Sequence, residues 1–260
     1  ELIKIIFDFV FVRCYEDKEG KHKYIRAMPA PGTKTISEKA FYRNENLEWV
    51  IIDKSVEIIE NDAFNGCSTI TKIIIPNSVK KICAGAFWQC FKLSKIVIGN
   101  CVEEIEEEAF SGCVLLNNVN IPNSVTRIGQ SAFRMCYSLT SITIPDTMDH
   151  ISRFCFSGCK DLTSVTIGNS VEIICDGAFA SCESLREIII PNCVKIIVRK
   201  AFIYCSNLTK VFISDSVEEI EEFAFENCPK LQEASIPKNL EEDAWAFFPE
   251  NTKIIVRPVS

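Results

Sequence analysis

Residues 121–144, which decide the fold, read IPNSVTRIGQSAFRMCYSLTSITI. The phenylalanine of this stretch, Phe133, recurs along the chain at a fixed step of 23 residues, and alanine precedes it in most copies. The phenylalanines at this step are Phe41, Phe64, Phe87, Phe110, Phe133, Phe156, Phe179, Phe202 and Phe225, with Phe248 on a tenth step. A fixed period of this length indicates a repeat protein, in which each unit stacks on the next.

Other columns of the repeat keep the same step. Three residues after the phenylalanine comes cysteine in eight copies, with Asn44 instead in the first. Six residues after it comes leucine or isoleucine, and nine and eleven after it come pairs such as Ile142 and Ile144. This Leu-x-x-Ile-x-Ile segment alternates apolar and other residues, which predicts a strand with one buried face. Proline or glycine then ends the strand in most copies, and Asn or Asp with Ser or Thr provides a turn.

The remaining part of each unit completes one coil. A short Val-x-x-Ile segment is predicted to return across the core, and Ala-Phe-x-x-Cys is predicted to form one helical or 3₁₀ turn. A single unit cannot bury its apolar face, but stacked neighbours can. We therefore predict an α/β leucine-rich-repeat solenoid, curved, with mostly short parallel strands and short helical or 3₁₀ turns. A parallel β-helix is the main competing architecture. The Ala-Phe turn favours the curved horseshoe, because it widens the side opposite the strands.

The two ends depart from the repeat. Residues 1–32 lack the Ala-Phe marker and are expected to form an N-terminal capping hairpin, with a charged turn at 16–23. Residues 33–240 hold nine repeats of the solenoid, and residues 241–260, where Asp243 replaces the core isoleucine, are expected to form a C-terminal cap. All three segments are expected to make one structural domain. The chain begins with Glu1 rather than Met, so the lack of a visible signal peptide says little about location.

These units resemble the BspA-type leucine-rich repeats. The resemblance is carried by segments such as 121–133 and 144–159, and it covers roughly residues 36–236. Proteins of that family are mostly surface or secreted proteins of bacteria and some parasitic protists, implicated in adhesion to host proteins or other cells. The resemblance implies a non-catalytic, extracellular or cell-surface module that binds protein or glycan ligands.

Composition excludes several other functions. Lys plus Arg is 28 against 35 for Asp plus Glu, a net charge of −7, and an acidic chain is a poor nucleic-acid binder. Only two histidines, His22 and His150, are available for acid–base or metal chemistry. The longest apolar run, 2–12, is interrupted by charges and is too short to span a bilayer. We expect no enzyme activity, no cofactor, no membrane span, no nucleic-acid partner and a monomer.

The fourteen cysteines raise the question of disulfides or a metal site. Eight lie in one column, so they are expected to stack at about 4.8 Å with parallel side chains, a poor geometry for a bridge. The chain has no Cys-x-x-Cys and no Cys/His cluster with zinc spacing. Free cysteine packs as a small hydrophobe, so we predict a ladder of buried, reduced thiols and no metal site. The sequence does not decide the redox state of the six cysteines outside this column.

Two polar features are candidates for a catalytic site or a metal site, and each has a simpler interpretation. His150 follows Asp149 in a turn, but its column varies freely along the repeats, which favours a solvated histidine over a catalytic one. The acidic run at 103–108, echoed at 218–222, could offer oxygen ligands to calcium. It lacks the alternating Asp-x-Asp pattern of a loop site, and charge runs are usually solvated faces.

The outward residues of the predicted strands are the best candidates for ligand binding on the concave face. An aromatic residue, aliphatic residues and lysines coincide on the first three coils, and a weaker group lies further on, whereas the middle coils are small and polar. Apolar residues on consecutive coils make a patch, and aromatic anchors are typical of interfaces. If β-branched residues merely suit strands on either face, the chain is instead a structural spacer of a larger surface protein. The first group is Trp49, Ile51, Lys72, Ile74, Lys95 and Val97, and the second is Arg186, Glu187, Lys210 and Phe212.

Overall fold

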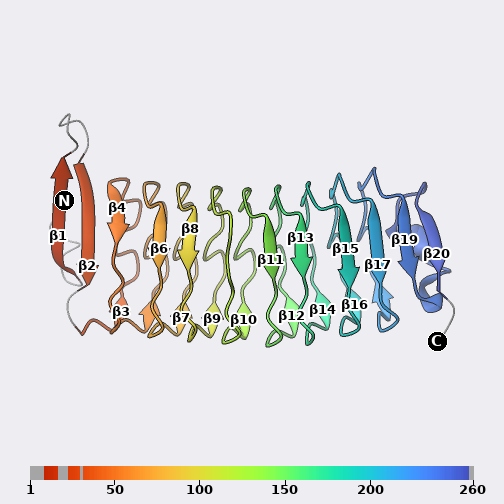
Figure 1. The fold of residues 1–260 in the computed structure, drawn as a ribbon, viewed down its shortest axis with the longest axis horizontal. Coiled ribbons are helices and arrows are strands. Elements are labelled where there is room, and N and C mark those ends of the chain that lie inside the picture. Colours follow the sequence, from red (N-terminus) through yellow and green to blue (C-terminus); the bar gives the residue numbers. More distant parts are fainter. Residues whose placement is uncertain (1–8, 17–22, 30–31, 258–260) are drawn as a thin grey trace.

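The computed structural model describes residues 9–16, 23–29 and 32–257. Successive coils lie side by side along the long axis, with the N-terminal hairpin at one end and the C-terminal segment at the other (Figure 1). Most coils carry a longer strand on one face and a two-residue strand on another. Strands of each kind pair in parallel with counterparts in neighbouring coils, although the longer strands are divided among several short sheets. The arrangement confirms the predicted solenoid with its 23-residue period.

The longer strands lie on what we call the strand face, the face predicted to be concave. In β6, β8 and β11 the middle residue is buried and its neighbours are exposed, as the alternation predicted. Between β8 and β11, one coil contributes only a bridge, from Lys95 to Asn118. The strands are β4 (Leu47–Val50), β6 (Lys72–Ile74), β8 (Lys95–Val97), β11 (Ser141–Thr143), β13 (Ser164–Thr166), β15 (Glu187–Ile190), β17 (Lys210–Ile213), β19 (Glu233–Ile236) and β20 (Lys253–Val256).

The Val-x-x-Ile segments form the second set of strands. Each is two residues long and buries its second residue, so the return segment contributes one isoleucine per coil to the core. These strands are β3 (Thr35–Ile36), β5 (Ile58–Ile59), β7 (Lys81–Ile82), β9 (Glu104–Ile105), β10 (Arg127–Ile128), β12 (His150–Ile151), β14 (Ile173–Ile174), β16 (Ile196–Ile197) and β18 (Glu219–Ile220).

The Ala-Phe segment differs from the predicted helical or 3₁₀ turn. Successive i→i+3 bonds are present, as from Arg134 N–H to the Ser131 carbonyl at 3.0 Å and from Cys136 N–H to the Phe133 carbonyl at 3.3 Å. However, Ser131 and Met135, two residues before and after Phe133, have φ of 56° and 57°. The same two positions are left-handed in the coils of all nine phenylalanines from Phe41 to Phe225. A left-handed residue interrupts a right-handed helix, so the segment is a series of tight turns.

The phenylalanines form a continuous stack through the core. From Phe41 to Phe225 their rings are buried, with neighbouring centroids 5.0–5.6 Å apart and ring planes within 12° of parallel. Phe248 extends the stack by one ring, at 5.0 Å from Phe225. Aromatic pairs at this separation add about 0.5–1.5 kcal/mol each beyond their buried area. The repeated phenylalanine therefore joins each coil to the next.

Backbone and thiol hydrogen bonds follow the same stack. The Phe110 N–H donates to the Ala132 carbonyl of the next coil at 2.8 Å, and the equivalent bond recurs along the stack. The Cys136 thiol donates back to the Phe110 carbonyl at 3.4 Å, and all eight column thiols make this bond to the phenylalanine 26 residues earlier. The thirteen cysteines with described side chains are all free, and the eight of the column are buried, as predicted.

Elements outside the repeat flank the solenoid at both ends of the described chain. β1 (Phe9–Glu16) and β2 (Lys23–Pro29) form an antiparallel hairpin, and β2 pairs in parallel with β4. The charged turn expected between them lies largely at 17–22, outside the described residues. At the other end, the 3₁₀ helix η2 (Lys238–Leu240) and the short helix α1 (Ala244–Phe247) precede β20, which pairs with β19. None of the helices in the described ranges is long and apolar enough to cross a membrane.

We expect Phe133→Ala to lower the free energy of unfolding by about 3–5 kcal/mol, because it leaves a cavity in the middle of the ring stack. Urea unfolding followed by circular dichroism measures the change. Thr143→Ala, on the exposed strand face of the same repeat, should alter stability by no more than about 0.5 kcal/mol. A loss below about 1 kcal/mol for Phe133→Ala would contradict the central role of the stack.

The buried thiols predict a loss of stability at high pH. Burial raises the pKa of Cys67, Cys113 and Cys159 from 9.0 to about 12. Above pH 9 the unfolded chain therefore releases thiol protons that the folded chain retains, so the free energy of unfolding falls between pH 9 and about 12. Replacing Cys113 with alanine should reduce this slope by up to about 1.4 kcal/mol per pH unit. An unchanged slope, or rapid alkylation of the column thiols in the folded protein at pH 8, would contradict the prediction.

Candidate functional site

The first predicted group of ligand-binding residues lies together on the strand face, and we call it the N-terminal patch. It comprises Trp49, Ile51, Lys72, Ile74, Lys95 and Val97. The side chains of Trp49, Ile74 and Val97 are 44%, 53% and 52% exposed, whereas Ile51 is half-buried. Three large apolar residues on three consecutive coils therefore offer accessible surface at one end of the solenoid.

Two lysines stand side by side in this patch. In the parallel register of β6 and β8, Lys72 lies opposite Lys95, and Ile74 lies opposite Val97. Neither lysine forms an ion pair with any residue in the described part of the chain. Like charges on directly opposed strand positions destabilise a sheet slightly. The apolar pair is thus accompanied by two positive charges that the fold itself does not balance.

Trp49 lies where the solenoid meets the hairpin. It belongs to β4, and in backbone register it stands opposite Arg26 of β2. The sheet that contains Trp49 therefore continues into the hairpin, whereas Ile74 and Val97 belong to the separate two-stranded sheet of β6 and β8. The repeat pattern could not reveal this neighbour, because residues 1–32 lie outside the repeat.

The second predicted group is arranged differently. Arg186, Glu187 and Lys210 are exposed, but charges alternate along the coils, from Glu187 to Lys210 to Glu233 to Lys253 in successive register positions. Opposite charges at such positions favour the sheet itself. This end of the strand face therefore balances its own charge, unlike the N-terminal patch.

Phe212 of the second group has a partner within the chain. The guanidinium carbon of Arg257 lies 4.4 Å from the centre of the Phe212 ring, and the same guanidinium donates to Ser235 Oγ at 2.9 Å and to Asp215 Oδ1 at 2.6 Å. The sequence analysis missed Arg257, because it lies two coils away and no local pattern links it to Phe212. The predicted group also left out Ile189, which is 67% exposed and stands opposite Phe212. Ile189 occupies the same outward repeat position as Phe212, and that position could have identified it from the sequence.

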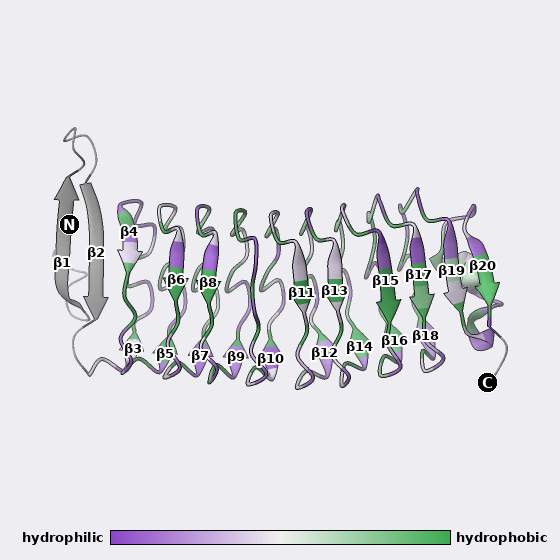
Figure 2. Cartoon of the chain, viewed as in Figure 1, coloured by the Kyte–Doolittle hydropathy of each residue, from purple (hydrophilic) through white to green (hydrophobic). Residues whose placement is uncertain are grey.

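The middle of the strand face separates the two groups. Ser141 and Thr143 of β11 stand opposite Ser164 and Thr166 of β13, so small polar side chains cover these coils. In Figure 2, β11 and β13 are pale, between strands that change from purple to green along their length, such as β6, β8 and β15. The two groups are therefore distinct surfaces.

A depression of about 400 Å³ beside β10 and β12 contains His150, Ser152 and Cys175. His150 Nδ1 lies 2.5 Å from Oδ1 of its own neighbour Asp149, and the Ser152 hydroxyl donates to the Ile128 carbonyl. Burial raises the pKa of the Cys175 thiol, which disfavours the thiolate. Histidine, serine and cysteine share this site, but the serine and the cysteine lack the activation that nucleophilic catalysis requires.

Three of the five glutamates in the acidic run at 103–108 pair with lysines of the preceding coil. Glu103 pairs with Lys80 at 3.1 Å, and Glu104 and Glu106 pair with Lys81 at 3.2 and 2.7 Å. The hydrogen bonds that Lys81 donates to the carboxylates of Glu106 and Glu104 raise the pKa of Lys81. Among the residues that the structure describes, no group of three metal-ligating side chains is placed to hold an ion. The run is a partly paired, solvated face.

Comparison with known families identifies the repeat. A family model described as BspA type leucine rich repeat region (6 copies) matches residues 34–163 and 126–255. No curated protein sequence matches the chain significantly.

Solved structures show the same fold. A leucine rich cell surface protein from Faecalibacterium prausnitzii is 28% identical with a TM-score of 0.55; the match covers 80% of this chain and 58% of that one. The chain thus spans less than two thirds of this relative. A leucine rich repeat protein from T. pallidum is 25% identical with a TM-score of 0.57, and the match covers 76% of this chain and 88% of that one.

Proposed function

We propose that this chain, which belongs to the BspA-type leucine-rich-repeat family, is a non-catalytic binding module of a secreted or cell-surface protein. In this proposal it acts as a monomer in adhesion or host interaction, and it contacts a protein partner through the N-terminal patch. Family membership and the similarity to a cell surface protein of Faecalibacterium prausnitzii support the extracellular location. The hydrogen bond from the Ser152 hydroxyl to the Ile128 carbonyl and the raised pKa of Cys175 support the non-catalytic role.

One observation carries the choice of surface: Ile74 and Val97 are half exposed beside two lysines that no described residue pairs. A partner with an apolar side chain flanked by carboxylates would cover the aliphatic pair and balance Lys72 and Lys95. Charge complementarity of this kind favours a correct partner over others and accelerates association. Aliphatic side chains offer no hydrogen bonds, so we favour a protein over a glycan here.

The alternative is a structural spacer within a longer surface protein. The match covers 58% of the Faecalibacterium prausnitzii relative. Such a partial length fits a spacer, because a spacer needs only a continuous stack of coils. The two functions differ in what they require of the N-terminal patch. A spacer should tolerate its replacement without loss of any partner, whereas a binding module should not.

We expect Trp49→Ala to weaken the affinity for the partner by about 30-fold, since truncating a desolvated aromatic anchor costs about 2 kcal/mol. The partner is first recovered with the intact chain from a host-surface or extracellular-matrix extract, identified by mass spectrometry and purified. Titration by isothermal calorimetry then compares Trp49→Ala with Thr143→Ala, which lies on the polar middle of the same face and should change the affinity little.

Charge reversal provides a second arm of that experiment. Lys72→Glu should slow association and remove much of the salt dependence of binding, because the steering charge is lost. Equal affinities for Trp49→Ala, Lys72→Glu and Thr143→Ala, with folds intact by circular dichroism, would show that binding lies elsewhere or that the chain is a spacer.

A further inference from the structure

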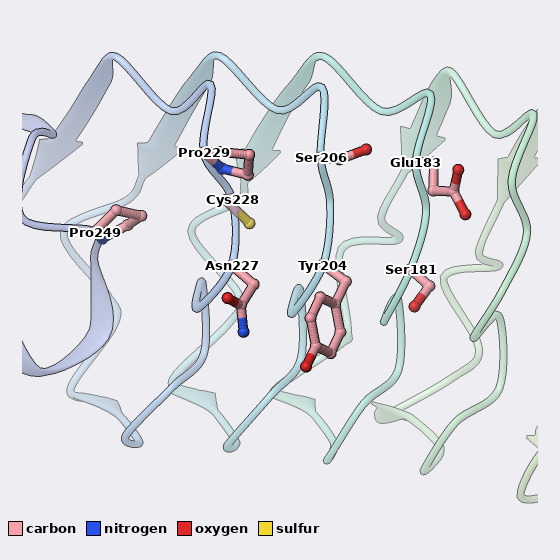
Figure 3. A pocket seen from close by; sticks show the side chains of 8 residues that line it. All are labelled: Ser181, Glu183, Tyr204, Ser206, Asn227, Cys228, Pro229 and Pro249. Carbon is pink, nitrogen blue, oxygen red and sulfur yellow. The ribbon is translucent and has the colours of Figure 1, made fainter.

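A groove of about 760 Å³ lies off the strand face, over the last coils of the solenoid. Two rows of side chains line it, each row taken from one repeat position in three consecutive coils. One row is Ser181, Tyr204 and Asn227, and the other is Glu183, Ser206 and Pro229 (Figure 3). Cys228 and Pro249 complete the lining, and the Cys228 thiol is already engaged by the Phe202 carbonyl. The groove is shallow and open to solvent, so a ligand would lie along it with one side exposed.

Tyr204 is in a conformation that its side chain disfavours. Its φ is 60°, in the left-handed region, where glycine is the residue without a steric cost, and glycine occupies this repeat position as Gly66, Gly112 and Gly158. The Tyr204 side chain is 54% exposed, so it gains little from burial in return. All nine coils are left-handed at this repeat position, so the conformation belongs to the repeat. Tyr204 differs from its counterparts in having an exposed aromatic side chain there, and that side chain lines the groove.

The polar groups of the groove are available to a ligand. Within the described part of the chain, the hydroxyls of Ser181, Tyr204 and Ser206 make no hydrogen bond, and neither does the Asn227 amide. Glu183 is the one charged residue in the lining. The groove therefore offers neutral donors and acceptors, one carboxylate and an aromatic ring, with no cation.

The carboxylate and the backbone near it are held in place. Glu183 Oε1 lies 3.0 Å from Lys160 Nζ of the preceding coil. The Asn207 side-chain amide donates to the Glu183 carbonyl at 2.7 Å, and Lys230 Nζ donates to Asn207 Oδ1 at 2.6 Å. One oxygen of Glu183 is thereby left to accept further hydrogen bonds, on a backbone fixed from the next two coils. A site built from supported side chains loses less entropy on binding than a loose one.

We propose that this groove binds a neutral oligosaccharide. The C–H face of a pyranose ring stacks on Tyr204, whose amphipathic ring offers an apolar face and a polar hydroxyl. The hydroxyls at the rim of the sugar exchange hydrogen bonds with Ser181, Ser206, Asn227 and Glu183. The site differs from the N-terminal patch in residues, face and ligand, so it does not depend on the proposed protein binding.

The charges of the groove decide against other ligands. A sulfated glycan, a phosphate or a nucleic acid needs cations, and the lining has none; its one charged side chain, Glu183, is already paired with Lys160 beside the groove. A peptide would find only Tyr204 and two prolines as apolar contacts, while the hydroxyl-rich rows suit a ligand with many hydroxyls. A neutral saccharide needs no cation and carries many hydroxyl groups, so it fits the groove on both counts.

The test uses the whole chain and five neutral hexasaccharides, built from glucose, mannose, galactose, xylose or N-acetylglucosamine, with a heparin hexasaccharide as the anionic arm. Saturation-transfer NMR detects binding and isothermal calorimetry measures it. At least one neutral hexasaccharide should bind, and more tightly than heparin. Failure of all five to bind would overturn the proposal, as would tighter binding of heparin. The proposal would also be overturned if no saccharide bound but a peptide selected from a display library did, and if replacing Tyr204 abolished the binding of that peptide.

Variants at the left-handed repeat position separate binding from folding. Tyr204→Gly should weaken saccharide binding at least about tenfold, while the melting temperature stays equal or rises, because glycine removes the strain. Met135→Gly is the matched control: Met135 has φ of 57° at the same repeat position three coils earlier, and its replacement should leave saccharide affinity unchanged. Tyr204→Phe, which keeps the ring, should retain most of the affinity. Full affinity in Tyr204→Gly would overturn the role of the ring.

Discussion

The stack of phenylalanine rings is the interaction on which the rest of the structure depends. Rings 5.0–5.6 Å apart require each coil to return its phenylalanine directly above the previous one. The N–H of each phenylalanine donates to the next coil, and its carbonyl accepts a cysteine thiol from that coil, so ring, backbone and thiol repeat together. A single inserted residue would break all three at once, which explains why the 23-residue step is uninterrupted.

A core this repetitive leaves function to the outward positions. Because equivalent residues of successive coils lie side by side, one substitution per repeat produces a continuous surface stripe. The strand face illustrates this: Lys72 beside Lys95 makes an unbalanced charge, while Glu187, Lys210, Glu233 and Lys253 alternate and balance one another. The same backbone thus carries one end with unbalanced positive charge and one end whose charges alternate in sign.

The left-handed turn positions add a second kind of freedom. Arginine, glycine, serine, glutamine, methionine, asparagine and tyrosine all occupy the position two residues after the phenylalanine, although only glycine does so without strain. The inter-coil hydrogen bonds hold this conformation whatever side chain is present. The scaffold can therefore hold a bulky ring such as that of Tyr204 at a site where an isolated turn would reject it.

The sequence by itself determined the period, the strands, the buried phenylalanine and cysteine columns, and the outward columns that contain Trp49, Ile74 and Val97, because each depends on spacing along the chain. It did not determine that the Ala-Phe segment is a left-handed turn rather than a helical one, since hydrogen bonds to the neighbouring coil decide those φ angles. Arg257 over Phe212, Arg26 opposite Trp49 and the groove around Tyr204 were likewise decided by tertiary structure. Each joins residues from different coils or from outside the repeat, and contacts of that kind leave no local pattern in the chain.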